Sequence, residues 1–589
     1  MRPGPLRFGN SFLVTPWPAA LLLAIAVYVL GLGGQYIPSN GDEMVYAHIA
    51  RVTAATGHWL PLASELVDTR NTKPPLLFWQ AMVAGGWGEN WHLAALRTPS
   101  VLYLLCVAAA IAACVRSITR RTSDGLLAAC LFLGFLSTFR YGRPFLTSAP
   151  ETFWFSLPLF ALLWQRLRDP ATSPGLLQHV LLGLGIGLGL AYKSFALAAP
   201  ACAAWWLALV LSDAQPGWRS LWRHSWRTAV SGTLALGVFG LWFVLDPDPS
   251  AVWREFIVGE NASKFSDARG YWQEALSLSG SSLWSQLLAF AVNAGLLALP
   301  VIGLGVLGLT VWWTQRTPLR QLSPAQRILL AWAAVWLLVF LFPSQRSARY
   351  VIPAMPAVAM LLALSWQRIA RGWFIGTLLL CALALLVLGR IAWVGHALQL
   401  YSSLEITLAL GCAAFGLLLV GAGAIQARWL RPASLVGVLL VYATFNLTVA
   451  PLDGPLGHYP PEASRQAGLR IAVPNGFNSQ FERFQFLLPG SHRFMPYESG
   501  ARALARQTPG SPAPGSAQVL QTLLASHDAV VWAPSNTQEA QPSCEPDCEV
   551  LGQRWVLKSR HLPGEVRLDN LWHPEQWLFQ REWLLRRKP

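Results

Sequence analysis

Residues 372–395 read GWFIGTLLLCALALLVLGRIAWVG, an apolar run long enough to cross the roughly 30 Å hydrocarbon core of a membrane as a helix. Runs of this kind recur from the N-terminus to about residue 450 and then stop. The composition agrees: 54% of the 589 residues are hydrophobic and 12% are charged, against about 25% charged in a soluble domain. We therefore expect an all-α polytopic membrane protein, followed by a region in a different solvent.

The apolar runs predict about thirteen membrane-spanning helices. Their expected ranges are 17–37, 97–115, 123–139, 150–165, 176–194, 196–212, 228–246, 284–313, 328–343, 350–366, 372–395, 403–425 and 432–450. With a cytoplasmic N-terminus, arginines recur in every inner segment, as the positive-inside rule predicts: Arg2, Arg7, Arg116, Arg120, Arg121, Arg166, Arg168, Arg219, Arg223, Arg227, Arg316, Arg320, Arg327, Arg368, Arg371, Arg428 and Arg431. The odd number of spans then places residues 451–589 outside.

This topology divides the chain into a transmembrane domain, residues 1–450, and a soluble domain, residues 451–589. The outer loops of the first domain are unequal, because 38–96 is long and 247–283 is of middle length. Long loops are commonly functional. Within the first loop, GDEMVYAHIARVTAATG and KPPLLFWQAMVAGGW predict short amphipathic helices along the interface.

The soluble region predicts a small α/β fold, with strands in DAVVWAP and also in WVLKSR and EVRLDNLW. Cys544 and Cys548 lie there in CEPDC, where a local disulfide is a better interpretation than a four-ligand zinc site. The net charge of +15 does not indicate nucleic acid, since most basic residues lie in short loops instead of a soluble stripe.

Charged residues on the outer side are the candidates for chemistry. Asp42 and Glu43 follow the first span and open a helix, so they either cap that helix or act on a substrate as a base or a cation ligand. Basic residues there run against the charge bias and either snorkel to headgroups or bind a lipid phosphate: Lys73, Arg97, Arg140, Arg143, Lys193, Arg346 and Arg349. In the second loop, Glu260, Asn261 and Lys264 fit a sugar pocket or a solvated loop equally well.

Taken in order, these motifs resemble the polyprenyl-phosphate-sugar-dependent membrane glycosyltransferases of the GT-C fold, and among them the lipid A aminoarabinose transferase and protein O-mannosyltransferase group. The similarity covers roughly residues 15–370. It is carried by the first carboxylates and by five further features on the expected outer face: KPPLLFW, Arg97, GLGLAYKS, GENASKFS and PSQRSARYVIPAMPAVAML.

The resemblance implies a role for each matching residue. Asp42 would be the principal catalytic carboxylate with Glu43 beside it, and Lys73, Arg97, Lys193 and Arg349, joined by Arg346, would hold the donor phosphate. The expected substrate-pocket residues are Tyr46, Arg143, Glu260, Asn261, Lys264 and Tyr350. Two positions depart from the family pattern: Ser148 stands where a second Asp is usual, with Glu151 as its candidate replacement one helical turn later, and Thr72 stands where the aminoarabinose enzymes carry Glu.

The expected activity is inverting transfer of a sugar from undecaprenyl phosphate to lipid A or another envelope acceptor. The expected location is the bacterial inner membrane, with the soluble domain in the periplasm and membrane lipids around the helices. No cofactor is assigned, although Asp42 would be a ligand if a divalent cation takes part. The alternatives are a protein O-mannosyltransferase-type enzyme and a flippase for lipid-linked sugars, which would carry charges or repeated broken helices in mid-membrane.

Overall fold

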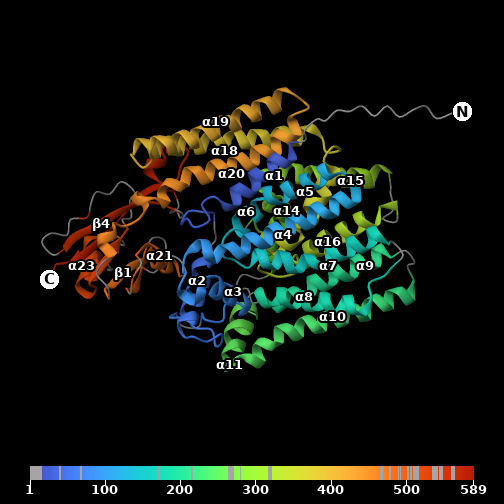
Figure 1. The fold of residues 1–589 in the computed structure, drawn as a ribbon, viewed down its shortest axis with the longest axis horizontal. Helices are drawn as coiled ribbons and strands as arrows, with labels where there is room; N and C mark the ends of the chain where they lie inside the picture. Colours follow the sequence, from blue (N-terminus) through green and yellow to red (C-terminus); the bar gives the residue numbers. More distant parts are fainter. Residues whose placement is uncertain are drawn as a thin grey trace.

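A computed structural model describes residues 16–588, apart from 39–40, 67–68, 170–171, 214–216, 263–270, 279, 316–320, 465–467, 477–478, 489, 491, 500–502, 505–506, 508–515, 534–541, 543–547, 559–560 and 562–563. Long helices form one bundle, and a small sheet domain lies at one end of it (Figure 1). The end of the bundle that carries α2 (Asp42–Ala55) and α3 (Leu76–Ala84) is the end that faces the sheet domain.

The main helices of the bundle are α1 (Trp17–Val29), α4 (Leu93–Thr119), α5 (Thr122–Gly134), α6 (Leu136–Gly142), α7 (Ser148–Arg168), α8 (Leu176–Tyr192), α9 (Ala198–Ser212), α10 (Trp218–Leu245), α14 (Ala289–Ala294), α15 (Ala298–Gln315), α16 (Pro324–Val339), α17 (Met355–Ser365), α18 (Arg371–Ala397), α19 (Ser403–Ile425) and α20 (Leu430–Val449). Shorter helices between α10 and α14 are α11 (Pro249–Val252), the π-helix Trp253–Asn261, α12 (Tyr271–Leu276) and α13 (Leu283–Leu287).

Each expected span overlaps a helix. In the described residues, eight helices are long and apolar enough to cross a membrane, and α5 with α6 makes a ninth if that pair, bent by 57°, is one span. Shorter apolar helices occur at Trp17–Val29, Leu176–Tyr192 and Pro324–Val339. The chain is thus a multi-pass α-helical membrane protein, and thirteen crossings remain a prediction.

The first outer loop forms the two helices that its amphipathic pattern predicts. Helix α2 begins at Asp42, and its buried face includes Tyr46 and Ile49. Helix α3 begins just after Pro74 and Pro75 and buries Phe78 against the same core. A proline suits a helix start, because the first turn does not need its missing N–H group.

The soluble domain contains a five-stranded mixed sheet in the order β2-β1-β3-β5-β4, so an α/β fold is confirmed. Its elements are β1 (Arg470–Asn475), α21 (Phe484–Leu487), β2 (Arg493–Glu498), α23 (Ala517–Ser526), β3 (Ala529–Trp532), β4 (Cys548–Leu557) and β5 (Phe579–Arg587). Strands β1, β2 and β3 are parallel, whereas β5 pairs antiparallel with β3 and β4.

DAVVWAP and the start of WVLKSR lie in strands as predicted, but the prediction of a strand in EVRLDNLW is wrong. Those residues form turns. The preceding Gly564 has a φ of +78°, and the backbone N–H of Arg567 donates to Asn570 Oδ1 at 2.8 Å, so local hydrogen bonds hold the backbone in a turn.

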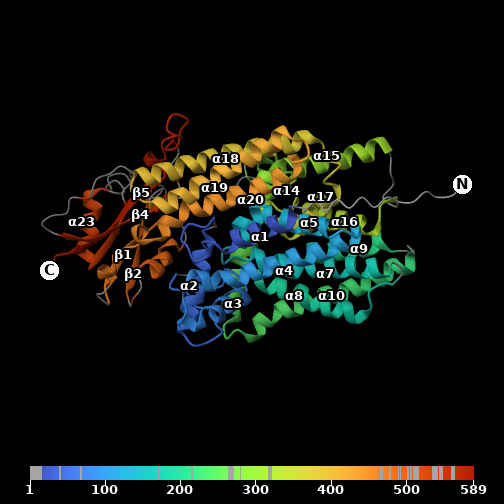
Figure 2. The ribbon, with the colours of Figure 1, turned by 45° about the horizontal axis from the view of Figure 1, so that its top comes forward.

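The sheet domain contacts the bundle through apolar as well as polar side chains. Phe579 at the start of β5 packs in one cluster with Leu452, just after α20, and with Tyr401 and Ile406 near the start of α19. Figure 2 shows the same arrangement from another side, with the ends of α18, α19 and α20 running up to the sheet. The last helices of the bundle and the last strand of the chain therefore meet where the bundle and the sheet domain join.

Candidate active site

Asp42 and Glu43 are neighbours in sequence, but their side chains go to different partners. Both lie in the first turn of α2, where negative charge is favoured by the helix dipole. Asp42 Oδ2 lies 3.3 Å from Arg349 Nη1, and this carboxylate is 29% exposed. The Glu43 side chain is 3% exposed and pairs with Arg97.

The Glu43–Arg97 pair is buried and bidentate. Arg97 donates from Nε and Nη2 to the two Glu43 oxygens at 2.7 and 2.9 Å. Its Nη1 donates to the carbonyls of Leu32 and Gly34, and the backbone N–H of Phe145 donates to Glu43 Oε1 at 2.8 Å. All three guanidinium nitrogens are therefore engaged within the protein, so the pair fixes the start of α2. From the resemblance we expected Arg97 to contact the donor phosphate and Glu43 to act beside Asp42 in catalysis. In the structure these two residues pair with each other.

Three other acid–cation pairs surround the Tyr46 ring, and we call this group the Tyr46 site: Tyr46, Asp42, Arg349, Lys73, Glu260, Lys193 and Glu151. Lys73 Nζ lies 2.7 Å from Glu260 Oε1 and 6.0 Å from the centre of the Tyr46 ring. Lys193 Nζ lies 3.1 Å from Glu151 Oε2 and donates to Thr147 Oγ1 at 3.0 Å. The site thus joins both long outer loops to the starts or ends of bundle helices.

Four of these charges act on the Tyr46 phenol. Burial raises the pKa of the Tyr46 phenol well above its usual range, and the Asp42, Glu260 and Glu151 carboxylates raise it further, against the opposite effect of Arg349. Tyr46 is 4% exposed and packs edge-on against Phe78 and Phe145. It is therefore a neutral hydrogen-bond donor in a fixed orientation.

Two buried hydroxyls at this site have no protein partner among the described residues: Thr72 Oγ1, next to Lys73, and Ser148 Oγ, one turn before Glu151. Buried polar groups in proteins are normally hydrogen-bonded. Orphaned hydroxyls beside charged groups are consistent with a polar ligand, so these two positions suit contacts with a substrate.

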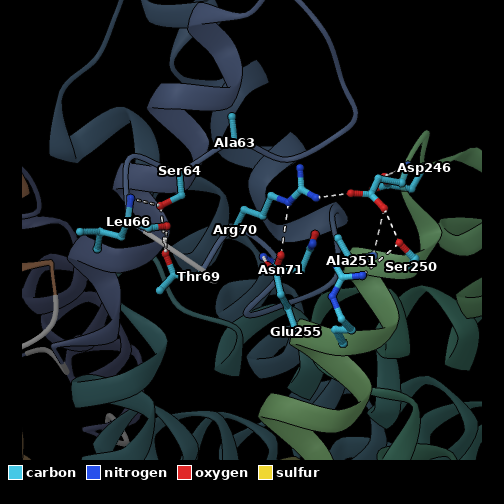
Figure 3. Close-up of polar contacts among 12 residues, drawn as sticks. Ala63, Ser64, Leu66, Thr69, Arg70, Asn71, Asp246, Ser250, Ala251 and Glu255 are labelled. Atoms are coloured by element: carbon cyan, nitrogen blue, oxygen red, sulfur yellow. Dashed lines mark hydrogen bonds and ion pairs between the residues drawn. The ribbon is translucent and has the colours of Figure 1, made fainter.

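A clamp that the sequence did not predict holds the two outer loops together (Figure 3). Arg70 Nη2 donates to Asp248 Oδ2 at 2.6 Å, and Arg70 Nε lies 3.4 Å from Glu255 Oε1. The Asn71 backbone N–H donates to the other Glu255 oxygen at 3.1 Å. Hydrogen bonds from Ser250, from the backbone of Ala251 and from Arg70 lower the pKa of Asp248, which therefore stays ionised.

The clamp positions the Lys73–Glu260 pair, since Lys73 follows Asn71 by two residues and Glu260 follows Glu255 by five. Its sequence signal was the occurrence of opposite charges in the two long outer loops. The residues that pair could not be chosen from that signal alone.

Three further predicted residues form hydrogen bonds with other parts of the protein. Arg346 donates to the carbonyls of Leu341 and Ser281 and is 3% exposed, so these bonds tie its own loop to the loop 247–283. Arg143 is fully buried and donates to Asn446 Oδ1 and the Leu30 carbonyl. Asn261 accepts a hydrogen bond from Ser194 Oγ at 2.9 Å, next to Lys193.

Of the other predicted positions, Tyr350 packs its ring against Phe340 at 5.1 Å. Lys264 and Cys544 lie outside the described residues. Cys548 is disulfide-bonded, whereas Cys106, Cys114, Cys130, Cys202, Cys381 and Cys412 are free. Among the residues that the structure describes, no group of three or more His, Cys, Asp or Glu side chains could hold a metal ion.

A buried polar contact between α2 and the soluble domain was also missed. Glu482 accepts from His48 Nδ1 at 2.8 Å and from Arg51 Nε at 2.6 Å, and the His48 and Glu482 side chains are fully buried. The Glu65 backbone N–H donates to His48 Nε2, which fixes the proton of the ring on Nδ1. The helix that carries Asp42 is thus bonded to the soluble domain through two residues one turn apart, His48 and Arg51.

Comparison with known proteins finds similar sequences and structures. No family model matches the chain. An undecaprenyl phosphate-alpha-4-amino-4-deoxy-L-arabinose arabinosyl transferase of Sodalis glossinidius is 26% identical over 344 residues, which cover 58% of this chain and 56% of that protein. Its counterpart from Yersinia enterocolitica is 24% identical over 396 residues, 64% of this chain and 65% of that one. The chain thus matches these relatives over less than two thirds of their length.

Among solved structures, ArnT from Cupriavidus metallidurans bound to undecaprenyl phosphate superposes with a TM-score of 0.55, covering 88% of this chain and 94% of that one at 18% identity. Similarity at this level concerns the fold. The chain therefore has the GT-C fold of ArnT and resembles the aminoarabinose transferases among the polyprenyl-phosphate-sugar-dependent glycosyltransferases.

Proposed function

We propose that this protein is a membrane glycosyltransferase that moves a sugar from undecaprenyl phosphate to lipid A or another acceptor of the bacterial cell envelope. The observation that carries the proposal is the Tyr46 site, where three cations and three carboxylates meet on outer-face elements of an ArnT-like fold. The similar proteins include undecaprenyl phosphate-aminoarabinose arabinosyl transferases and an ArnT bound to undecaprenyl phosphate, which supports a lipid-phosphate donor.

Lys73, Lys193 and Arg349 are the proposed phosphate-binding residues. Each is now paired with one carboxylate, at 2.7 to 3.3 Å. A phosphate oxygen accepts the same kind of charge-assisted hydrogen bond as a carboxylate oxygen, so the donor phosphate can take the place of a carboxylate. These cations then stabilise the phosphate as it leaves, where negative charge develops most in this reaction.

Asp42 is the proposed base when the acceptor is a hydroxyl. When Arg349 turns to the donor phosphate, Asp42 Oδ2 exchanges this cation for the acceptor hydroxyl and takes its proton. The acceptor oxygen attacks the anomeric carbon opposite the phosphate, the carbon–phosphate oxygen bond breaks, and the configuration inverts. When the acceptor is itself a phosphate, no proton is removed, and Asp42 serves to position the donor or a cation.

Glu151 is the proposed second acidic residue in place of Ser148. It is 2% exposed, pairs with Lys193, and contributes to the electrostatic field at Tyr46. A role for it in orienting Lys193 requires no movement of the helix. Tyr46, Glu260 and Asn261 complete the proposed sugar pocket.

The proposed orientation has a cytoplasmic N-terminus and a periplasmic sheet domain, with residues 1–450 as the membrane domain and 451–589 as the soluble domain. The regular arginines of the inner segments support it. Cysteines introduced at exposed Trp218 and Leu568 test it: a membrane-impermeant maleimide added to intact spheroplasts labels the second position and not the first.

Reconstituted proteoliposomes test the activity. Transfer of labelled sugar from undecaprenyl phosphate to lipid A is expected with the wild-type protein and is slower with Asp42→Asn. Movement of the lipid-linked sugar between leaflets without transfer would instead support a flippase. Mass spectrometry of lipid A and glycoproteins from a deletion strain then identifies the sugar and the acceptor, including a protein acceptor of the O-mannosyltransferase type.

A further inference from the structure

A cavity of about 380 Å³ lies between the bundle and the soluble domain, and we call it the interdomain cavity. It is lined by the glycine-rich segment after α1, by the residues that start α4, by the end of α20 and by residues near α21. Its size is within the range of small-molecule sites. None of its lining residues belongs to the Tyr46 site.

One wall of the interdomain cavity is built around a carboxylate. Asp453 Oδ1 accepts a hydrogen bond from the Gln35 backbone N–H at 2.7 Å. A Cβ atom at Gly34 would collide with Asp453 Oδ2, so only glycine allows the carboxylate to lie against this segment. The side chain is therefore held in place before any ligand arrives.

The other polar groups of the cavity supply both donors and acceptors. Trp91 Nε1 is buried and has no partner among the described residues. His92 Nδ1 accepts from the Ala95 backbone N–H, which leaves its Nε2 as a donor. His458 Nδ1 lies 3.0 Å from the Gly454 carbonyl, which leaves its Nε2 as an acceptor.

This combination fits a sugar ring. The indole of Trp91 and the ring of Phe486 offer apolar faces, and the polar groups match hydroxyls that both donate and accept. Among the lining residues in the described part of the chain, Asp453 carries the formal charge and no Lys or Arg occurs. A phosphate is therefore disfavoured, whereas a neutral or amine-bearing sugar is accepted.

We propose that the interdomain cavity is a second sugar-binding site, which takes a neutral or amine-bearing sugar of the acceptor while the phosphate-bearing donor binds at the Tyr46 site. The assignment to the acceptor rests on the proposed function. Arg97 connects the two places, since it donates to the Gly34 carbonyl at the cavity and to Glu43, the neighbour of Asp42. An acceptor held here lies next to the structure that fixes the reacting helix.

Kinetics of two variants test the proposal. Asp453→Asn removes the charge, and Trp91→Phe keeps a ring but removes the orphaned donor. Losing one such hydrogen bond, about 1.4 kcal/mol, is expected to raise the acceptor KM about tenfold and to leave the donor KM unchanged. Asp528→Asn, an exposed Asp of the soluble domain paired with Arg470, is the matched control and changes neither value. An unchanged acceptor KM, or a parallel rise in the donor KM, overturns the proposal.

A direct binding measurement separates this proposal from the proposed function. Saturation-transfer NMR with the full chain in nanodiscs uses glucosamine, glucose and glucose 1-phosphate as probes. Signals are expected for the first two, weakened by Trp91→Phe and not by Asp528→Asn, with unfolding temperatures measured to verify that each variant is folded. If the wild type binds these sugars but transfers none, the proposed function fails and the cavity assignment stands. If neither sugar binds, the assignment fails whatever the activity.

Discussion

The buried contact between Glu482 and helix α2 gives the most demanding test of how the soluble domain serves the site. Glu482→Gln keeps the size of the side chain and removes its charge. The carboxylate now accepts from His48 Nδ1 at 2.8 Å and from Arg51 at 2.6 and 3.0 Å, with no exposed surface of its own. A glutamine oxygen in the place of Oε2 can keep the bonds from His48 and from Arg51 Nη2, but its amide group then faces Arg51 Nε, and the guanidinium loses its counter-charge.

Removing one partner of a buried ion pair costs about 3–5 kcal/mol. Arg51 is 25% exposed and regains some hydration, so we expect the lower end of that range, about 3 kcal/mol. Such a loss multiplies the population in which the soluble domain is detached from α2 by roughly 150-fold, at 1.4 kcal/mol for each factor of ten. Helix α2 then loses the support that orients Asp42.

Hydrogen exchange of the amides in residues 42–55 measures this opening directly. Faster exchange in α2 is expected for Glu482→Gln, together with at least a tenfold lower transfer rate. Glu549→Gln is the matched control: it removes a partly exposed ion pair with Arg586 in the same sheet, which is worth under about 1 kcal/mol, and should leave α2 unchanged. Unchanged protection of α2 and full activity in Glu482→Gln would refute the coupling between the soluble domain and the site.

Four further predictions address the site and the sheet. Asp42→Asn lowers transfer to a hydroxyl acceptor by about 10²–10⁴-fold in single-turnover assays, and a smaller effect would remove Asp42 as the base. Arg97→Lys keeps the charge but not the bidentate bonds, so kcat falls while the donor KM stays constant; a rise in the donor KM would restore Arg97 as a phosphate ligand. Arg70→Ala breaks a partly exposed clamp worth about 1 kcal/mol and raises the donor KM up to about fivefold, and a loss of all activity would contradict this estimate. Burial raises the pKa of Glu582, but Arg554 and Arg483 lower it more, so that it lies below its usual value. The ionised Glu582 side chain therefore stabilises the sheet domain above about pH 4.5, and this stabilisation is lost as pH falls. Proteolysis of the sheet domain at pH 7 and pH 4, compared with Glu582→Gln, measures the loss.

The bundle and its outer helices were largely predictable, because hydropathy and amphipathic periodicity are local properties. Segments 41–57 and 73–87 were expected to be helical and contain α2 and α3. The sheet was less accessible. Strand β5, FQREWLLRR, carries four charges, yet most of it is buried. It is buried because Glu582 pairs with Arg554 and Arg483, which are 28 and 99 residues away in sequence.

The same reason limited the prediction of the site. Residue types and the side of the membrane pointed to Asp42, Lys73, Lys193 and Arg349, and these do converge near Tyr46. The sequence did not distinguish Arg349, which pairs with Asp42 across 307 residues, from Arg97, which pairs with Glu43 across 54. Pairing across such separations depends on the packing of helices, and no local pattern encodes it.

Burial separates the candidate basic residues into two physical classes. The guanidiniums of Arg97, Arg143 and Arg346 are at most 3% exposed, and each donates to backbone carbonyls. Turning one of them toward a substrate would leave buried carbonyls without a donor, at about 1–3 kcal/mol for each group. Evolution of a phosphate site from such residues is therefore unfavourable.

Lys73, Lys193 and Arg349 differ because their side chains are 12%, 15% and 25% exposed and each holds a carboxylate. Water can hydrate Asp42 and Glu260, which are 29% and 32% exposed, when Arg349 and Lys73 release them, so exchange for a phosphate costs little at these two pairs. Glu151 is 2% exposed, so Lys193 keeps this partner and offers its remaining N–H groups to the phosphate. The carboxylates keep the cations ordered before the donor binds. The lipid phosphate that takes their place leaves after the sugar has been transferred. An outer-face cation is thus suited to the donor when its acid partner is exchangeable, and suited to holding α2 when its partners are buried carbonyls.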